Sequence, residues 1–447
     1  MKDINIYANR RTKLMNKIND LGGGIVIIYN SPKYQRNADI YYPYRHDSDF
    51  YYLTGFSEPN ACLVLIVSDQ YQRSILFCRS KDFIKDMWEG PVYGPNIAAK
   101  LFGFDEGYSI QELNKMIPNM VLNKKSIYAK LYSINNKNIL QQIQFWIHTA
   151  KKENSSEITL PTSLCDISYL LSDMRLIKDH NEISIIRKSA NIAASSHIHA
   201  MLNTKPGMHE YEIEAEITYQ FRRQGASSIA YDSIIASGKN ACTIHYSTGN
   251  SILCNGDLIL VDAGCEFNSY ASDITRTFPV NGKFNNVQLA FYEIVLSAQK
   301  AAIEKIIPGK KYNEAHEAAV KILAQGMLDE KLLTGSLDGI IESREYLKYY
   351  PHSTSHWLGL DVHDCGNYKK LSSKNENNFS TWRELKEGMV LTIEPGLYIN
   401  PNQNIPKHFW NIGIRIEDTV IVTKTGYELI TRDVPVEPYQ IEDLMKR

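Results

Sequence analysis

The first third of the chain alternates short apolar runs with amphipathic segments. The segment "YANRRTKLMNKIND" has apolar residues at helical spacing and is followed by "LGGG", which predicts a helix that ends at the glycine run. The later runs "IVIIYN", "ACLVLIVSD" and "SILFC" are short and almost wholly apolar, which indicates buried strands. The pattern therefore predicts an α/β domain at the N-terminus.

The pattern changes to long amphipathic helices in "SLCDISYLLSDMRLIKDHNEISIIRKSANIAASSHIHAML". Within it, "KDHNE" is a helix start, because Asp and Asn followed by Glu can cap the first turn. A chain of 447 residues is long for one domain. We place the boundary near Met174 and expect two domains, residues 1–173 and 174–447.

Beyond this boundary the order of elements runs twice. Helices to about Gly225 precede strands in "GDLILVDAGCEF" and "SDITRTFPV", and helices to about Asp329 precede strands in "GMVLTIEPGLYI" and "GIRIEDTVIV". This order predicts an internal duplication, without a strict residue repeat. The whole chain is thus expected to be α/β or α+β, with a second domain of two similar halves.

Carboxylates interrupt these apolar strands. Asp262, Glu394 and Glu417 have apolar neighbours, and Asp273 opens the strand that returns from Asp262. A buried, unpaired carboxylate is costly or takes up a proton, so four of them require a shared positive charge, which a metal site would supply. In the alternative interpretation each acid caps a strand end or pairs with a local base; Arg415 and Glu417, on one strand face, could pair.

Histidines accompany these acids, because "HSTSHWLGLDVHD" places three histidines and two aspartates in thirteen residues. Four carboxylates and one histidine form a mostly oxygen ligand set, which suits Mn²⁺ or a similar ion better than structural zinc. Four acids are too many for a single ion that keeps one position open for substrate. Two ions bridged by carboxylates account better for this number of acids. Such a pair can hold a hydroxide and polarise a carbonyl, which implies hydrolysis.

The composition of the chain narrows the classes of partner that it could bind. Lys+Arg 49 against Asp+Glu 50 gives a net charge of -1 without a block of like charge, so the usual electrostatic reason to bind nucleic acid or a membrane is missing. The N-terminus is polar and no apolar run approaches a bilayer span, which predicts a cytoplasmic protein. The seven cysteines form no CxxC pair, which favours reduced core residues over a disulfide frame.

The motifs "LILVDAG", "SDITRTF", "HSTSHWLGLDVHD", "LTIEPGLYI" and "IGIRIEDTVIV" resemble the metallopeptidase family with the pita-bread fold, which includes aminopeptidase P, prolidase and methionine aminopeptidase. The stretch "RNADIYYPYRHDSDFYYLTGFSEPNACLVLI" resembles the N-terminal domain of bacterial aminopeptidase P. The resemblance covers nearly the whole chain. It implies an N-terminal α/β domain and a C-terminal pita-bread catalytic domain with pseudo-duplicated halves.

The resemblance also implies a ligand set for a dinuclear centre, typically of manganese. In the family's pattern the residues matched by Asp273 and Glu417 bridge the two ions. The residue matched by Asp262 holds one ion, and those matched by His356 and Glu394 hold the other.

Further roles follow from the same resemblance. Glu394 would take the proton of the attacking water and pass it on. His363 and His245 would contact the scissile carbonyl and the substrate backbone, and His352 would line the pocket for the residue after the cut bond. Tyr398 and Arg415 match a network that supports the metal ligands.

The implied activity is removal of the first residue from peptides whose second residue is proline. An X-Pro bond lacks an N–H and has a ring of fixed φ, so a compact groove can select it. The resemblance also implies a homotetramer built as a dimer of dimers, in which Trp88 reaches the site of a neighbouring subunit. Packing of Trp88 within its own loop is the alternative.

Two positions depart from the family pattern. Ser353 stands where glycine is usual, so the loop that carries His352 differs if that position needs a positive φ. The polar insert from Lys369 to Glu384 is expected to be a solvated loop.

Asp361 and Asp364 are expected to be turn or capping residues.

Three functions compete on this basis. An Xaa-Pro aminopeptidase is favoured by the N-terminal match, and a prolidase, which cuts dipeptides only, is the nearest alternative. A first domain of about 170 residues disfavours methionine aminopeptidase. A non-catalytic peptide-binding protein on the same fold is the third candidate, but all five ligand positions carry metal-binding residue types; the same observation disfavours creatinase-like relatives.

Overall fold

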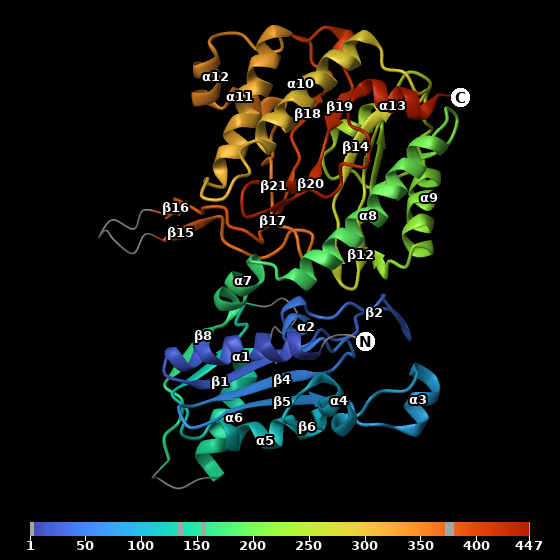
Figure 1. Ribbon diagram of the computed structural model, residues 1–447. Helices are drawn as coiled ribbons and strands as arrows, with labels where there is room; N and C mark the ends of the chain where they lie inside the picture. Colours follow the sequence, from blue (N-terminus) through green and yellow to red (C-terminus); the bar gives the residue numbers. More distant parts are fainter. Residues whose placement is uncertain (1–3, 133–137, 154–157, 372–379, 447) are drawn as a thin grey trace. The chain divides into compact units, whose positions relative to one another are not determined.

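The computed structural model divides the chain into two compact units, Met1–Met174 and Arg175–Arg447 (Figure 1). Each unit has its own hydrophobic core. None of the helices among the described residues is long and apolar enough to cross a membrane. The residues that the structure describes are 4–132, 138–153, 158–371 and 380–446.

A six-stranded mixed sheet forms the centre of the first unit (Figure 1). β1 pairs antiparallel with β4 and parallel with β7. The predicted strands in "IVIIYN", "ACLVLIVSD" and "SILFC" are confirmed as β1, β4 and β5. In sheet order the strands are β6 (Glu106–Ser109), β5 (Gln72–Cys78), β4 (Cys62–Val67), β1 (Gly24–Tyr29), β7 (Ser126–Ala129) and β8 (Ser163–Asp166).

Helices cover this sheet because its strands are apolar on both faces. Ile25 and Ile27 point to one face, where they share a core with Ile117 and Trp146 from two helices. Trp146 is fully buried, and its indole N–H donates to Asn114 Oδ1 at 2.9 Å. The helices of this unit are α1 (Ile4–Asp20), α2 (Ser48–Thr54), α3 (Phe83–Glu89), α4 (Pro95–Phe102), α5 (Leu113–Met120) and α6 (Ile139–Glu153).

The second unit contains two halves of the same element order, as the sequence predicts. α8 (His180–Asn203) and α9 (Glu210–Arg223) lead into the antiparallel pair β11 (Leu258–Asp262) and β14 (Thr275–Pro279). α8 begins at the predicted "KDHNE", where Asp179 caps the helix and Glu182 closes a capping box.

The second half repeats this order with two strand pairs. α10 (Asn286–Ile303) and α11 (Asn313–Asp329) precede the pairs β17 (Val390–Ile393) with β20 (Asp418–Val422), and β18 (Gly396–Ile399) with β19 (Ile412–Arg415). The remaining elements that matter here are β9 (Ser228–Ile229), β10 (Ile234–Ser237), β13 (Tyr270–Ala271), α12 (Leu337–Ser343), β15 (Lys369–Leu371) and β16 (Ser380–Trp382).

The strand register brings the four carboxylates to equivalent positions in the two halves. Asp262 is the last residue of β11 and pairs with Thr275, two residues beyond Asp273. In the other half, Glu394 directly follows β17 and Glu417 directly precedes β20. Each antiparallel strand pair therefore presents two acids at one end.

Hydrogen bonds join the two strand pairs at this point. The Glu417 N–H donates to the Thr275 carbonyl at 3.0 Å, and the Thr419 hydroxyl donates to the Asp273 carbonyl at 2.9 Å. Because β14 and the start of β20 lie side by side, the acids of one half face those of the other.

Candidate active site

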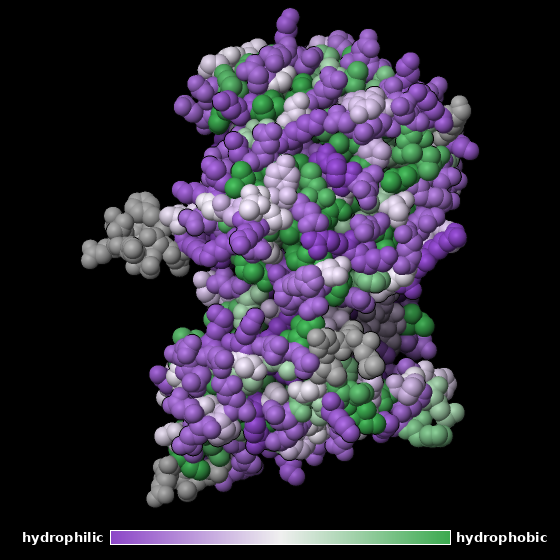
Figure 2. All heavy atoms as spheres, viewed as in Figure 1, coloured by the Kyte–Doolittle hydropathy of each residue, from purple (hydrophilic) through white to green (hydrophobic). Residues whose placement is uncertain are grey.

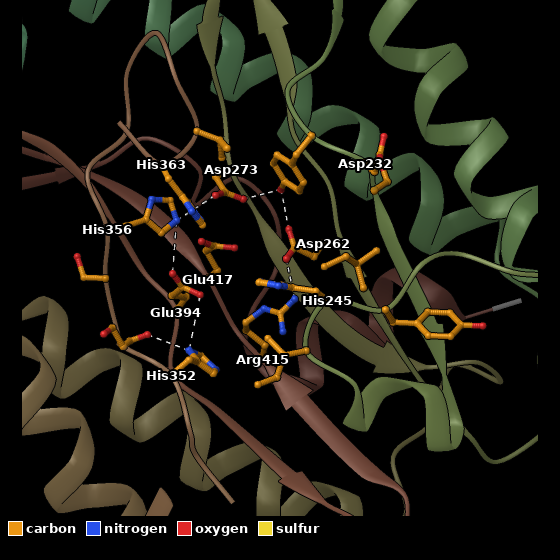
Figure 3. A pocket seen from close by; sticks show the side chains of 18 of the residues that line it. Asp232, His245, Asp262, Asp273, His352, His356, His363, Glu394, Arg415 and Glu417 are labelled. Atoms are coloured by element: carbon orange, nitrogen blue, oxygen red, sulfur yellow. Dashed lines mark hydrogen bonds and ion pairs between the residues drawn. The ribbon is translucent and has the colours of Figure 1, made fainter. Parts of the chain in front are cut away.

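The acids and histidines meet in a cavity of about 840 Å³ in the second unit (Figure 3). All five predicted metal ligands line it, so segments up to 155 residues apart converge. The predicted residues that line the cavity are Asp262, Asp273, His356, Glu394, Glu417, His245, His352, His363 and Arg415.

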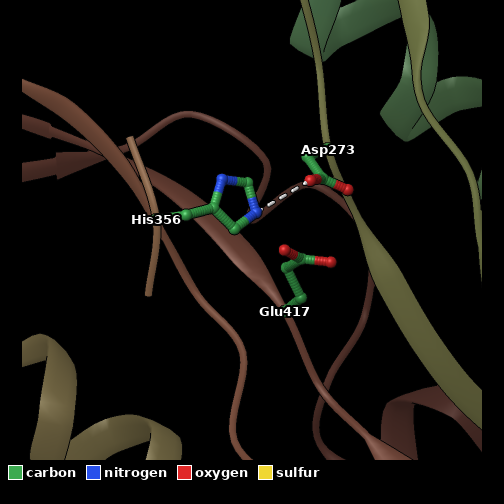
Figure 4. A group of neighbouring side chains, drawn as sticks. All are labelled: Asp273, His356 and Glu417. Carbon is green, nitrogen blue, oxygen red and sulfur yellow. Dashed lines mark ion pairs between the residues drawn. The ribbon is translucent and has the colours of Figure 1, made fainter. Parts of the chain in front are cut away.

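Three of the predicted ligands come close enough to share one ion (Figure 4). Asp273, His356 and Glu417 each offer one ligand atom, and these atoms lie within 4.8 Å of one another. His356 Nε2 is 3.3 Å from Asp273 Oδ2 and 3.4 Å from Glu394 Oε1. The geometry of this group is thus compatible with binding a divalent cation.

His356 is held in the tautomer that a ligand needs. Its Nδ1 lies 3.0 Å from the Trp357 carbonyl, which can only accept a hydrogen bond. Nδ1 therefore carries a proton, and Nε2 faces Asp273 and Glu394 (Figure 3). This is the usual way in which a backbone carbonyl orients a metal-binding histidine. Burial lowers the pKa of His356, but these two carboxylates raise it to about 9, so a metal ion would take the place of the proton on Nε2.

Burial opposes the ionisation of Glu394 and Glu417. Burial raises the pKa of Glu417 well above its usual value, and Asp273 and Glu394 raise it further. Burial likewise raises the pKa of Glu394 to about 7, against the opposing effect of His356. A set of buried acids that favours protonation is also a set whose charge a divalent metal can neutralise.

Tyr231 is a site residue that no sequence pattern marked. Its hydroxyl lies 2.6 Å from Asp262 Oδ1 and also contacts Asp273 Oδ1. A hydroxyl has one proton, so it can satisfy only one of these two oxygens, and the other needs a cation or a second proton. Because Tyr231 belongs to no periodic pattern, only the tertiary structure reveals it.

The local pairing of Arg415 with Glu417 does not occur. Arg415 Nη2 instead donates to Asp262 Oδ2 at 2.6 Å, from the opposite half of the unit. Glu417 lies beyond the end of β19 and accepts from the Thr275 hydroxyl at 2.7 Å. β19 ends at Arg415, so the same-face geometry of a continuous strand does not extend to Glu417.

A chain of hydrogen bonds extends from Arg415 to His352. Arg415 Nη1 donates to the Tyr398 hydroxyl at 2.9 Å, and this hydroxyl lies 2.8 Å from His352 Nε2. His352 Nδ1 is 2.8 Å from the Ser353 carbonyl and must donate to it. Burial lowers the pKa of His352 to about 4, and Arg415 lowers it further. The ring is therefore neutral and accepts the Tyr398 proton at Nε2.

The other two predicted histidines line the same cavity. The His363 ring lies 4.2 Å from that of His356, and burial followed by the neighbouring His356 lowers the pKa of His363. His245 faces the cavity beside Asp262 and Arg415 (Figure 3). Both rings are thus accessible to a ligand in the cavity.

The structure corrects the interpretation of Asp364 as a turn or capping residue. Asp364 is buried and accepts from Arg175 Nη2 at 2.5 Å and from Lys178 Nζ at 2.9 Å. Asp361 pairs with the same Arg175 at 2.7 Å. An ion pair between residues 186 positions apart in the chain cannot be predicted from the local sequence.

Two further expectations have structural outcomes. Ser353 has no positive φ, so the loop that carries His352 does not require glycine there. The insert is not only a loop, because β15 and β16 pair antiparallel within it. Residues 372–379 of the insert lie outside the described part of the chain.

Trp88 lies in the other unit. It belongs to α3 and is 86 % exposed, without packing in its own loop. Its neighbours Phe83, Ile84 and Met87 on the same helix are also exposed. Figure 2 shows green, apolar side chains on the surface where Figure 1 places α3. This short helix therefore presents an apolar face to solvent.

Comparisons with known proteins agree with this architecture. The model of metallopeptidase family M24 matches residues 184–424, and that of the aminopeptidase P N-terminal domain matches residues 7–128. The Xaa-Pro aminopeptidase of Haemophilus influenzae is 39% identical over 98% of this chain and 96% of its own length.

Solved structures give the same result. Aminopeptidase PepP of Pseudomonas aeruginosa has a TM-score of 0.93 at 40% identity, over 99% of this chain and 98% of its own. Aminopeptidase P of Escherichia coli with the inhibitor Pro-Leu has a TM-score of 0.92 at 37% identity, over the same shares of both chains. The fold is therefore the predicted N-terminal α/β domain with a pita-bread domain, and the chain belongs to the Xaa-Pro aminopeptidases of metallopeptidase family M24.

Proposed function

We propose a mechanism by which this metal-dependent Xaa-Pro aminopeptidase releases the first residue of peptides with proline at the second position. The observation that carries the proposal is the convergence of all five ligand-type residues in one cavity of a family M24 chain. We assign residues 1–173 to the aminopeptidase P-type N-terminal domain and 174–447 to the catalytic domain.

Asp262, Asp273, His356, Glu394 and Glu417 would hold two divalent ions, which we propose to be Mn²⁺. This oxygen-rich donor set, with one neutral imidazole, suits such ions. When bound, the ions lower the pKa of a water molecule and polarise the carbonyl of the scissile bond. Asp273 and Glu417 come from the two halves of the unit and, with His356, offer ligand atoms within 4.8 Å of one another, so both would hold the ions.

Glu394 is the proposed general base. Its side chain is 18% exposed, so water can reach it. Glu394 takes a proton from the attacking water and passes it to the departing proline nitrogen, which has no proton of its own before cleavage. The main-chain bond from Glu394 N–H to the Thr354 carbonyl, 2.8 Å, fixes the position of this base.

Three histidines would contact the peptide. His363, beside His356, donates to the carbonyl oxygen of the scissile bond, and His245 contacts the substrate backbone from the other side of the cavity. His352 borders the place of the proline ring. The Arg415–Tyr398–His352 chain keeps the His352 ring oriented, so Arg415 and Tyr398 act as positioning residues.

Recognition of proline is supported by a related complex. The inhibitor bound to the Escherichia coli enzyme is Pro-Leu, a dipeptide that begins with proline. In this chain the proline ring would pack beside His352, which lines the cavity and whose ring lies 5.5 Å from that of Tyr398. No N–H donor is needed from the substrate at the scissile bond, which distinguishes X-Pro from other peptides.

We also propose a cytoplasmic homotetramer built as a dimer of dimers. The exposed apolar face of α3, which includes Trp88, supports a subunit contact at this helix. In the tetramer, Trp88 would reach the substrate site of a neighbouring subunit.

The test is hydrolysis of an X-Pro dipeptide and an X-Pro-Y tripeptide by protein stripped of metal and refilled with Mn²⁺. Release of the first residue from the tripeptide is the expected result. Cleavage of the dipeptide alone would mean a prolidase, and a metal-loaded protein inert to both would mean a peptide-binding protein. Refilling with Zn²⁺, Co²⁺ or Mg²⁺ in parallel tests the choice of manganese.

A further inference from the structure

Two acids in the wall of the catalytic cavity have no part in the mechanism above. Glu214 lies on α9, and Asp232 lies between β9 and β10. Both line the cavity that contains the metal-ligand residues. Figure 3 places Asp232 on the Asp262 side, away from His356 and His363.

Tyr231 connects this part of the wall with the reaction centre. Its hydroxyl touches Asp262 and Asp273, and Asp232 is the next residue in the chain. Both Tyr231 and Asp232 line the cavity. The long side chain of a lysine or arginine can extend along a wall of this kind.

The negative charges of these two acids have no positively charged partner among the described residues. Of the six carboxylates that line the cavity, four belong to the proposed metal site. Glu214 and Asp232 have neither an ion pair nor a hydrogen bond with any residue that the structure describes. Burial and the neighbouring Asp232 raise the pKa of Glu214, so a cation placed between the two acids would relieve their repulsion.

An unpartnered hydroxyl lies in the same part of the wall. Ser233 is 3% exposed and lines the cavity, and its Oγ has no hydrogen-bond partner among the described residues. A buried hydroxyl normally has a partner. The ammonium or guanidinium group of a substrate can donate to it.

The cavity also offers apolar surface to an aliphatic stem. Ile234 and Ile244 line it and belong to a small apolar cluster with Tyr398. Lysine and arginine bury their methylene groups along such surfaces while the charged end reaches polar partners.

We infer that Glu214, Asp232 and Ser233 form a subsite that favours peptides whose first residue is lysine or arginine. The inference rests on the proposed function, because it names the side chain preferred at the first position of an X-Pro substrate. Asp232 is exposed in the described chain, so the charge interaction is that of a partly solvated pair. The expected preference is about fivefold in kcat/KM and falls as salt is raised.

The experiment compares Lys-Pro-Ala with norleucine-Pro-Ala on the Mn²⁺-loaded full-length protein. The first residues of these substrates have the same carbon chain and differ in the ammonium group. The lysine-to-norleucine ratio of kcat/KM should be about five in the natural protein. It should fall toward one in the double variant Glu214→Gln, Asp232→Asn. Glu342→Gln on α12, outside the cavity, removes one exposed charge and should keep the ratio.

Each outcome decides between alternatives. An equal ratio in the natural protein and the double variant would overturn the subsite while leaving the aminopeptidase function intact. A charge preference for lysine at the third position, measured with Ala-Pro-Lys and Ala-Pro-norleucine, would place the acids opposite the other end of the peptide and would also overturn it. Failure to cleave any X-Pro peptide would instead contradict the proposed function.

Discussion

Arg276 Nη2 donates to Asp418 Oδ1 at 2.8 Å, and neither side chain is exposed to solvent. The pair joins β14 of one half to β20 of the other, directly beside Glu417. Burial favours the neutral acid, but the charges of Arg276 and then Arg432 hold the pKa of Asp418 below its usual value. A buried ion pair that takes no part in the proposed chemistry therefore connects the two halves of the site.

Replacing Arg276 with Met should lower the free energy of unfolding by about 3–5 kcal/mol, because it leaves a buried carboxylate without its main partner. Urea unfolding followed by circular dichroism measures this. Arg432→Met is the matched control, since Arg432 also contacts Asp418, at 2.9 Å, but is 30% exposed. It should cost about 1 kcal/mol or less. Equal costs for both variants would show that the buried pair is not the stabilising contact.

Asp273→Ala should abolish hydrolysis of an X-Pro tripeptide, with a loss of at least about a thousandfold in kcat/KM. The variant removes a proposed bridging ligand, so its metal content should fall as well. Turnover and metal analysis of the same preparation measure both effects, with Glu342→Gln as the control. Near-normal turnover at full metal content would contradict the five-ligand assignment.

Tyr398→Phe should reduce kcat/KM or metal affinity about 10–100-fold. The change removes the hydroxyl that accepts from Arg415 and donates to His352 while keeping the ring. Tyr292→Phe is a matched control, because its hydroxyl is also buried but donates to the Val436 carbonyl at 2.9 Å, outside the cavity. A loss of the same size in the control would point to a general packing effect.

His197 should make the stability of the protein depend on pH. It is fully buried, and its Nε2–H donates to the Ala263 carbonyl at 2.9 Å. Burial lowers the pKa of His197 to about 4, and Arg276 lowers it further, whereas Asp273 and Asp418 raise it. In the unfolded chain the pKa is about 6.5. The unfolded state therefore takes up a proton first as the pH falls.

The stabilising effect of the neutral ring should be fully present above about pH 6.5 and be lost between pH 6.5 and about 4. The loss amounts to about 3 kcal/mol. Urea unfolding of metal-free protein across this range measures it, and His197→Gln should show a shallower dependence on pH. Parallel curves for the two proteins would exclude His197 as the titrating group.

Several structural features could be predicted because they have local causes. The apolar runs of β1, β4 and β5 and the cap at Asp179 depend on residues within a few positions of one another. The four acids in apolar strands were recognisable because a buried carboxylate needs compensation wherever it lies. The resemblance of the motifs then identified the family, which the comparisons confirm.

Other features depended on the pairing of distant segments. The partner of Arg415 is Asp262, 153 positions away, and not the nearby Glu417. Asp364 is paired with Arg175 and Lys178, although its local sequence suggested a turn. Tyr231 had no pattern to mark it and became a site residue only because the fold brings it to two of the acids.

The sequence by itself therefore determined the strands and helices with a clear apolar pattern, the acids that need charge compensation, and the family. The tertiary structure alone decided which acid meets which base, which hydroxyls reach the ligands, and that Glu214 and Asp232 share the cavity with them. The physical reason is that helical and strand patterns arise from contacts along the chain, whereas charge compensation depends on distances in space between residues far apart in sequence.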